Sequence, residues 1–246
     1  MALKYRLSWK TIDMPVRLEK ATSGRGLSGY GIKAKMVCPK CEGEVRQVYQ
    51  CFNCHSNYDR GDLTLRRDED TGVIFQEAER KAFMQNAVDK VIRIDENGEI
   101  PLMELSVNLL SIGDKYEIYN NDNDKYMMVM AKIYNYMIAK GVGLLCRYGY
   151  YGRNRAGLLI PAHDRIVLCE LVSQNLIKPA KQLGIVQHDN QTTDRLLSVA
   201  TETDTQGEDY MKFIELKMNG GHVEVKAKEE VDAKIDDEAI AFLEVV

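Results

Sequence analysis

The sequence has few of the features that mark a membrane protein or a secreted one. No stretch of apolar residues reaches the roughly 18 that a membrane-spanning helix needs. The opening MALKYRLSWK has no apolar segment of the kind found in secretory signals. Six cysteines occur among 246 residues, and four stand in metal-type pairs, which is typical of a reducing compartment. We therefore expect a soluble, cytoplasmic protein with no membrane contact.

Catalytic motifs are scarce as well. No nucleophile stands beside a base, and the glycine-rich residues 20–31 do not end in the Lys-Ser/Thr of a phosphate-binding loop. This segment either brings backbone close to a ligand or serves as a connector. The polar residues 120–125 lack the glycine and the terminal glutamate of a calcium loop. We therefore expect that the protein is not an enzyme, with a zinc nuclease as the enzymatic alternative.

Four cysteines form the strongest motif. Cys38 and Cys41 make one Cys-x-x-Cys pair, and Cys51 and Cys54 make a second pair after nine residues. Four thiolates at this spacing can surround one Zn²⁺ tetrahedrally and leave no position for a substrate. Two disulfides or a redox dithiol are alternatives, although a redox pair needs only one Cys-x-x-Cys beside a βαβ pattern. We predict structural zinc in a small four-cysteine, zinc-ribbon-like element within residues 36–60.

The remaining candidate ligands are interpreted more simply. His55 follows Cys54 and could replace a thiolate, but four cysteines suffice, so we interpret it as a neighbour of the site. Cys146 and Cys169 lie in apolar, strand-like stretches and are expected to be buried thiols.

The net charge of −4 conceals a strong segregation of charge along the chain. Residues 1–67 carry 13 Lys/Arg against 6 Asp/Glu, and residues 125–185 carry 9 against 2. Residues 68–124 carry 5 Lys/Arg against 14 Asp/Glu, and residues 200–246 carry 5 against 13. A basic face can attract a polyanion although the whole molecule is acidic. Chance segregation of solvated charge is the alternative.

Periodicity predicts a mixed, β-rich α+β fold. Alternating apolar residues favour strands in residues 3–18, and residues 75–90 and 125–140 have the spacing of amphipathic helices. An Asn-Gly pair within residues 95–100 is typical of a hairpin turn. The polar residues 187–210 resemble a linker or a mobile surface segment.

Residues 142–172 are expected to form two apolar strands around a basic, glycine-rich turn. Arginines and tyrosines alternate in this stretch: Arg147, Tyr148, Tyr150, Tyr151, Arg153, Arg155 and Arg165. A ribbon of this composition can contact phosphates along a duplex. It also suits a plain surface hairpin, and this stretch alone favours neither.

Several segments together carry a family resemblance. WKTIDMPVRLEKAT at Trp9–Thr22 and CPKCEGEV at Cys38–Val45 are two of them. The block Gly141–Val172 and YMKFIELKMNGG at residues 210–221 are the others. In this order they resemble the opening, the cysteine knuckle, the arginine-bearing hairpin and the terminal helix of the Ku family of DNA-end-binding proteins, in its short prokaryotic or phage form. The likeness extends over roughly residues 5–221.

The resemblance implies a Ku-like β-barrel core whose long connections arch into a ring. Two copies would pair as a homodimer and thread the end of a double-stranded DNA without reading its sequence. The role implied is non-homologous end joining, the repair of double-strand breaks, with recruitment of a DNA ligase. The barrel and bridge would occupy residues 1–185, and an acidic region with short helices residues 186–246. The setting would be the nucleoid of a bacterial, archaeal or phage-infected cell.

Phosphate contacts are expected from basic residues of the hairpin and of the N-terminal segment. They are Arg147, Arg153 and Arg155, and Arg17, Lys20, Arg25, Lys33 and Lys35. The chain departs from the family where CFNCHSNYDRGD replaces a Gly-Tyr-Glu-Tyr-like stretch, and it has no basic C-terminal extension. The first departure makes a fuller zinc site than the family's, while the lack of that extension and the overall acidity put tail-mediated DNA binding and ligase recruitment in doubt. The competing interpretation is a zinc-ribbon adaptor whose acidic blocks bind a protein partner.

Overall fold

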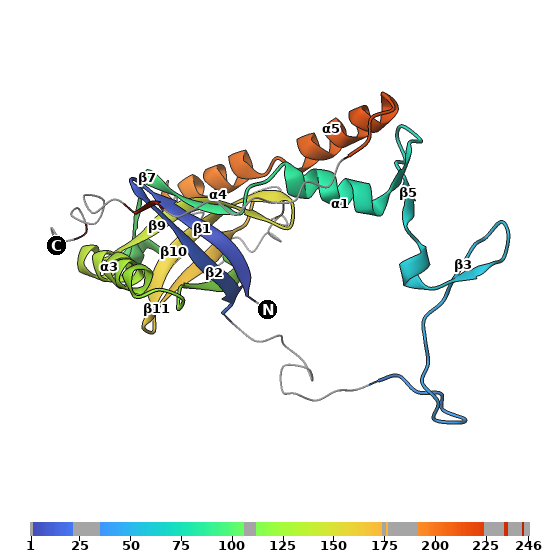
Figure 1. Ribbon diagram of the computed structural model, residues 1–246, viewed down its shortest axis with the longest axis horizontal. Coiled ribbons are helices and arrows are strands. Elements are labelled where there is room, and N and C mark those ends of the chain that lie inside the picture. Colours follow the sequence, from blue (N-terminus) through green and yellow to red (C-terminus); the bar gives the residue numbers. More distant parts are fainter. Residues whose placement is uncertain are drawn as a thin grey trace, which may run out of the picture. The chain divides into compact units, whose positions relative to one another are not determined.

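Seven strands close into a β-barrel in the computed structural model of the chain, which describes residues 2–21, 35–105, 112–173, 176, 191–223, 234, 235 and 243. Around the barrel the strands follow the order β1-β7-β9-β10-β11-β8-β2, and pairing of β2 with β1 closes it (Figure 1). Their bounds are β1 Leu3–Trp9, β2 Ile12–Lys20, β7 Val91–Pro101, β8 Ile112–Tyr119, β9 Val142–Tyr150, β10 Arg153–Ala162 and β11 Arg165–Leu171. β1 runs parallel to β7, and the other neighbours are antiparallel. The predicted mixed α+β class is confirmed.

The remaining elements are helices and short strands. The helices are α1 Glu77–Asn86, α2 Leu102–Leu105, α3 Asp124–Lys140, α4 Gln191–Thr203 and α5 Gln206–Met218, with a 3₁₀ turn η2 at Arg60–Asp62. The short strands are β3 Tyr49–Gln50, β4 Asn57–Tyr58, β5 Leu65–Arg67, β6 Ile74–Gln76 and β12 Lys234–Ile235, the last pairing with β2. Within the described part of the chain, no helix is long and apolar enough to cross a membrane.

The chain divides into two compact units. The barrel unit comprises Met1–Thr22, Met84–Tyr210 and Lys226–Val246, and the insert unit comprises Ser23–Phe83 and Met211–Val225. In chain order, the insert unit begins where the chain leaves β2, and the chain re-enters the barrel at β7. The expected division after residue 185 stays a prediction.

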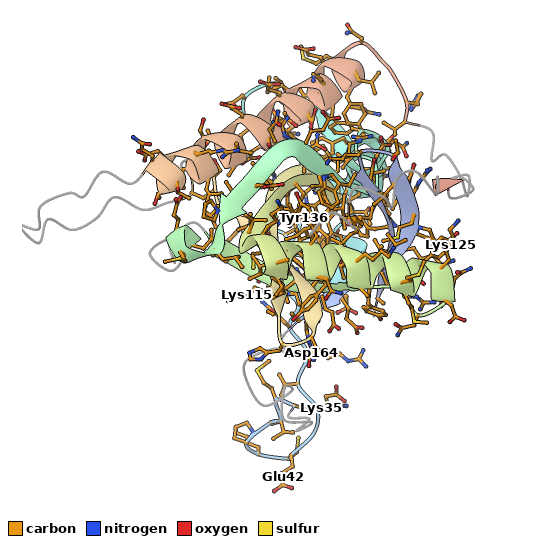
Figure 2. The ribbon with its side chains drawn as sticks, turned by 90° about the vertical axis from the view of Figure 1, so that its left-hand side faces the viewer. Lys35, Glu42, Lys115, Lys125, Tyr136 and Asp164 are labelled. Carbon is orange, nitrogen blue, oxygen red and sulfur yellow. The ribbon has the colours of Figure 1, made fainter. Side chains whose placement is uncertain are left out.

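The barrel interior is filled by alternate strand residues and by one face of α3. Val129, Ile133 and Met137 recur every four residues along α3 and are fully buried in the barrel core. Figure 2 shows Tyr136 on the same helix, and its ring meets the Trp9 ring edge-on, with centroids 5.5 Å apart. The helix predicted for residues 125–140 is confirmed, because this apolar face requires a buried surface to cover it.

The two ends of α3 follow from local chemistry. The Asn123 side chain accepts a hydrogen bond from the Lys125 backbone N–H at 2.8 Å and so caps the first turn. Gly141 ends the helix in the left-handed region at φ 64°, where its N–H donates to the last carbonyls.

A second apolar cluster lies on the outside of the barrel under α4. Leu196 and Ala200 of α4 pack with Leu145, Leu158 and Leu171 of the strands. Much of β9 and residues 156–159 of β10 are therefore buried on both faces, which explains the apolar runs in their sequences. The linker expected at residues 187–210 was wrong for α4, because its apolar residues are confined to Leu196–Ala200 and both ends of the helix are polar.

Two further expectations need correction. Residues 142–172 form three strands rather than two, because a second turn at His163 and Asp164 separates β10 from β11. The expected hairpin turn at Asn97-Gly98 does not occur: β7 continues through it with a register shift between Ile94 and Glu99. The fit at Gly98 is tight, since an added Cβ atom would lie 3.0 Å from the Leu145 Cβ.

The insert unit has its own small aromatic core. The Phe75 and Phe83 rings lie 5.1 Å and 5.5 Å from the Phe213 ring. Lys217 Nζ lies 3.2 Å from a Glu79 carboxylate oxygen beside this cluster. Residues 35–62 of the same unit, in contrast, contain no buried residue.

Candidate functional site

The two cysteine pairs lie in loops of the same backbone geometry, here named knuckle 1 (residues 38–43) and knuckle 2 (residues 51–56). In each, the first cysteine's N–H donates to the carbonyl five residues on, and its own carbonyl accepts from the N–H four residues on. The bonds are Cys38 to Gly43 and Glu42 to Cys38, both 2.8 Å, and Cys51 to Ser56 and His55 to Cys51, both 2.9 Å. The residue after the second cysteine is left-handed in both, Glu42 at φ 59° and His55 at φ 57°.

Polar groups around the sulfurs favour the thiolate form. The backbone N–H groups of Lys40 and then Cys41 lower the pKa of the Cys38 thiol, because they donate to its sulfur. In knuckle 2 the Ser56 hydroxyl, 3.3 Å from Cys54 Sγ, and the Ser56 backbone N–H lower the pKa of Cys54 to about 7. Because the thiolate is the form that binds a metal, both knuckles have the chemistry of metal ligands.

The four thiols are paired by knuckle but do not form one cluster. Across the described residues, no group of three or more Cys, His, Asp or Glu side chains is gathered closely enough to hold a metal ion. A tetrahedral zinc site needs four sulfurs around one point, and here the sulfurs lie as two separate pairs. The predicted zinc-ribbon-like element stays a prediction.

The β9–β10 hairpin ends in a two-residue turn. Tyr151 and Gly152 both have positive φ, 50° and 76°, as in the turns that match strand twist. Tyr150 pairs with Arg153 across this turn. Arg153 is exposed and makes no ion pair with any residue that the structure describes.

Arg155 instead turns toward the barrel interior. It lies directly opposite Tyr148, whose ring is in the barrel core, and it forms an ion pair with Glu170. The Arg155 and Glu170 side chains are only 21% and 19% exposed, and the guanidinium lies 5.3 Å from the Tyr150 ring centroid. Burial raises the pKa of Glu170, and the Arg155 charge opposes that rise.

The other predicted phosphate contacts are spread over the surface. Four are partly or largely exposed and pair with a carboxylate: Arg17 with Asp122 at 2.8 Å, Lys20 with Asp114 at 3.4 Å, Lys35 with Glu44 at 3.2 Å and Arg147 with Asp95 at 3.9 Å. Arg25 and Lys33 lie outside the described residues. Their contact with DNA stays a prediction.

Several exposed arginines were not among the predicted contacts. Arg46, Arg60, Arg66 and Arg67 lie in the insert unit and make no ion pair with another described residue. They contribute to the basic character of residues 1–67, but their place beside the two cysteine pairs favoured a structural metal element there. The structure shows that these side chains are exposed and without an ion pair, which the sequence cannot show, and such arginines can bind phosphate.

A scan against protein-family models and a search of curated protein sequences found no match to the chain.

Proposed function

We propose that the protein binds the ends of double-stranded DNA without sequence preference, as a homodimer, and takes part in end joining with a DNA ligase. The observation that carries this proposal is a closed seven-stranded barrel whose β2–β7 connection is a separate unit. A barrel with a long connection is what the Ku resemblance implies. The proposal requires no catalytic residue.

Surface chemistry supports a second copy as partner. The insert unit exposes eight large apolar side chains within residues 36–74, each at least 37% exposed: Met36, Val37, Val45, Val48, Phe52, Tyr58, Leu65 and Ile74. Exposed apolar side chains of this size are available for contact with a partner protein. The homodimer implied by the resemblance would cover them.

Electrostatics separate the basic residues that could meet phosphates from the one that could not. Exposed ion pairs such as Arg17–Asp122 are screened by water and contribute little to stability, so a phosphate can replace the carboxylate at little cost. The Arg155–Glu170 pair is largely buried and cannot be exchanged so easily. We therefore expect Arg153, Arg147 and Arg17 to contact phosphates, and Arg155 to hold the barrel together.

A gel shift of a linear duplex against a closed circle of the same sequence tests the proposal. An end-binding protein shifts the linear form, spares the circle, and loses affinity steeply as salt rises. Arg153→Glu should weaken binding roughly tenfold, since it replaces a phosphate contact with a repelling charge. Arg195→Glu is the matched control, because Arg195 is exposed but donates to the Asn97 carbonyl on α4's side of the barrel.

The outcomes separate the alternatives. Equal shifts of linear and circular DNA would mean general DNA affinity, and no shift of either would favour the protein-binding adaptor. Size-exclusion chromatography with and without linear duplex tests the dimer. Ligation of linear fragments by purified ligases, with and without the protein, tests the role in end joining.

A further inference from the structure

Residues 35–62 have ordered local structure but no apolar core. The two knuckles, the β3–β4 pair and the η2 turn all lie in this stretch, yet none of its residues is buried. Phe52, within knuckle 2, is 96% exposed. A segment of this size without a core is usually stabilised by a metal, a disulfide or a partner.

The two knuckles repeat each other residue for residue. Each has the same pair of backbone hydrogen bonds and the same left-handed residue after its second cysteine. The backbone thus fixes two thiols on each loop in the same way. A pair of thiolates held on one such loop supplies two corners of a tetrahedron, and two equal loops supply four.

The repeat also decides the role of His55. His55 occupies in knuckle 2 the position that Glu42 occupies in knuckle 1, and both serve as the left-handed turn residue. Figure 2 shows Glu42 at the tip of its loop. A turn position that accepts either side chain does not depend on imidazole, so four cysteines are the ligand set.

Nothing in the connecting segment opposes closure. Residues 45–48 belong to no helix or strand, and all four are exposed. Bending there would bring one knuckle onto the other without breaking the hydrogen bonds inside either loop. Thiolates select Zn²⁺ over Mg²⁺ and Ca²⁺, which prefer oxygen ligands.

We propose that Cys38, Cys41, Cys51 and Cys54 of a single chain hold one Zn²⁺, and that binding joins the two knuckles into one body. The thiol protons pass to the buffer as the four Zn–S bonds form. The ion then acts as the core that residues 35–62 lack. This inference does not depend on DNA binding.

Metal analysis of the purified full-length chain after chelator challenge is the first test. One zinc per chain is expected, and replacement by Co²⁺ should give the thiolate-to-metal charge-transfer absorption of a tetrahedral sulfur site. Cys38→Ser and Cys51→Ser, one from each knuckle, should each lose the metal. His55→Asn is the matched control: it removes the imidazole, tolerates the left-handed turn, and should keep a full equivalent.

Trp9 fluorescence shows whether each variant retains the barrel fold, because the only tryptophan is buried in the barrel core. Limited proteolysis of residues 35–62 should become much faster when zinc is removed. The proposal is overturned if the folded protein takes up no zinc, if a cysteine variant keeps a full equivalent, or if His55→Asn loses it. Half an equivalent of zinc per chain, bound only by a dimer, would also overturn it, because ligands would then come from two chains.

Discussion

The Arg155–Glu170 pair allows the sharpest test of how the hairpin is used. Both side chains are about four-fifths buried, at 21% and 19% exposure. Removing one partner of a fully buried pair costs about 3–5 kcal/mol, because it leaves a charge without compensation. Scaled by the burial, Arg155→Met and Glu170→Leu should each destabilise the protein by about 2–4 kcal/mol. Arg155→Met should lose a further 0.5–1 kcal/mol or so of attraction to the Tyr150 ring.

The double variant is expected to behave differently from either single one. With both charges replaced by apolar groups, no buried charge remains, so its stability should lie within about 1 kcal/mol of the original. The coupling between the two sites should therefore be about 3 kcal/mol or more. Urea unfolding followed by Trp9 fluorescence measures all four free energies, and equal m-values would show that the variants unfold comparably.

DNA binding by the same variants completes the test. Under conditions where it is fully folded, Arg155→Met should bind linear duplex nearly as well as the original protein. If Arg155→Met keeps full stability but loses affinity as Arg153→Glu does, Arg155 contacts phosphate and the inward ion pair is not its working state.

Three other changes probe the same end of the barrel. Gly149→Ala should destabilise the protein by about 1–3 kcal/mol, because the new Cβ would lie 2.1 Å from Val88 Cγ1 and 2.3 Å from the Asp89 carbonyl oxygen. Gly207→Ala is the control: Gly207 lies on a helix with open space around it, so this substitution should not destabilise the protein. Tyr148→Phe should stabilise the protein by about 1 kcal/mol, since that buried hydroxyl has no hydrogen-bond partner among the described residues. Tyr5→Phe should destabilise it by about 1 kcal/mol, because it removes the hydrogen bond to the Gly149 carbonyl at 2.6 Å. Equal effects of the two substitutions in chemical denaturation would contradict this reasoning. The pKa of Glu170 is raised on folding, so this carboxyl stays protonated to higher pH in the folded state than in the unfolded state, where its pKa is about 4.3. Its contribution to stability therefore falls as pH rises from about 4.3 through the folded-state pKa. Glu170→Gln should remove that fall from a pH series of unfolding free energies.

Sequence periodicity predicted those helices and strands whose apolar residues all pack against a single surface. The helix at residues 125–140 was found because one face packs into the barrel and its cap residues lie next to it in sequence. The strands of residues 3–18 were found because their alternate residues face the interior. α4 was missed because its buried face consists of Leu196, Ala200 and Thr203 alone.

Long-range pairing could not be predicted in the same way. The parallel contact of β1 with β7 joins Leu7 to Ile92, and nothing in either strand specifies the other. At Asn97-Gly98 the local turn preference was overridden, since the strand gains more from continuing along β9 with a bulge than from reversing. The sequence alone likewise could not separate Arg153 from Arg155, which differ in burial and in the ion pair that only Arg155 makes.

Closure of the barrel also sets an order of events during synthesis. β1 and β2 can pair at once, but the outer edge of β1 is covered by β7 and that of β2 by β8 and β12, all of which are translated much later. Until then a hairpin with alternate apolar residues leaves the ribosome with two open edges, a form prone to pair with other chains. The outward face of the hairpin carries Lys4, Arg6 and Arg17 together with Asp13 and Glu19. The first hairpin to form thus stays open at both edges until strands from much later in the chain reach it.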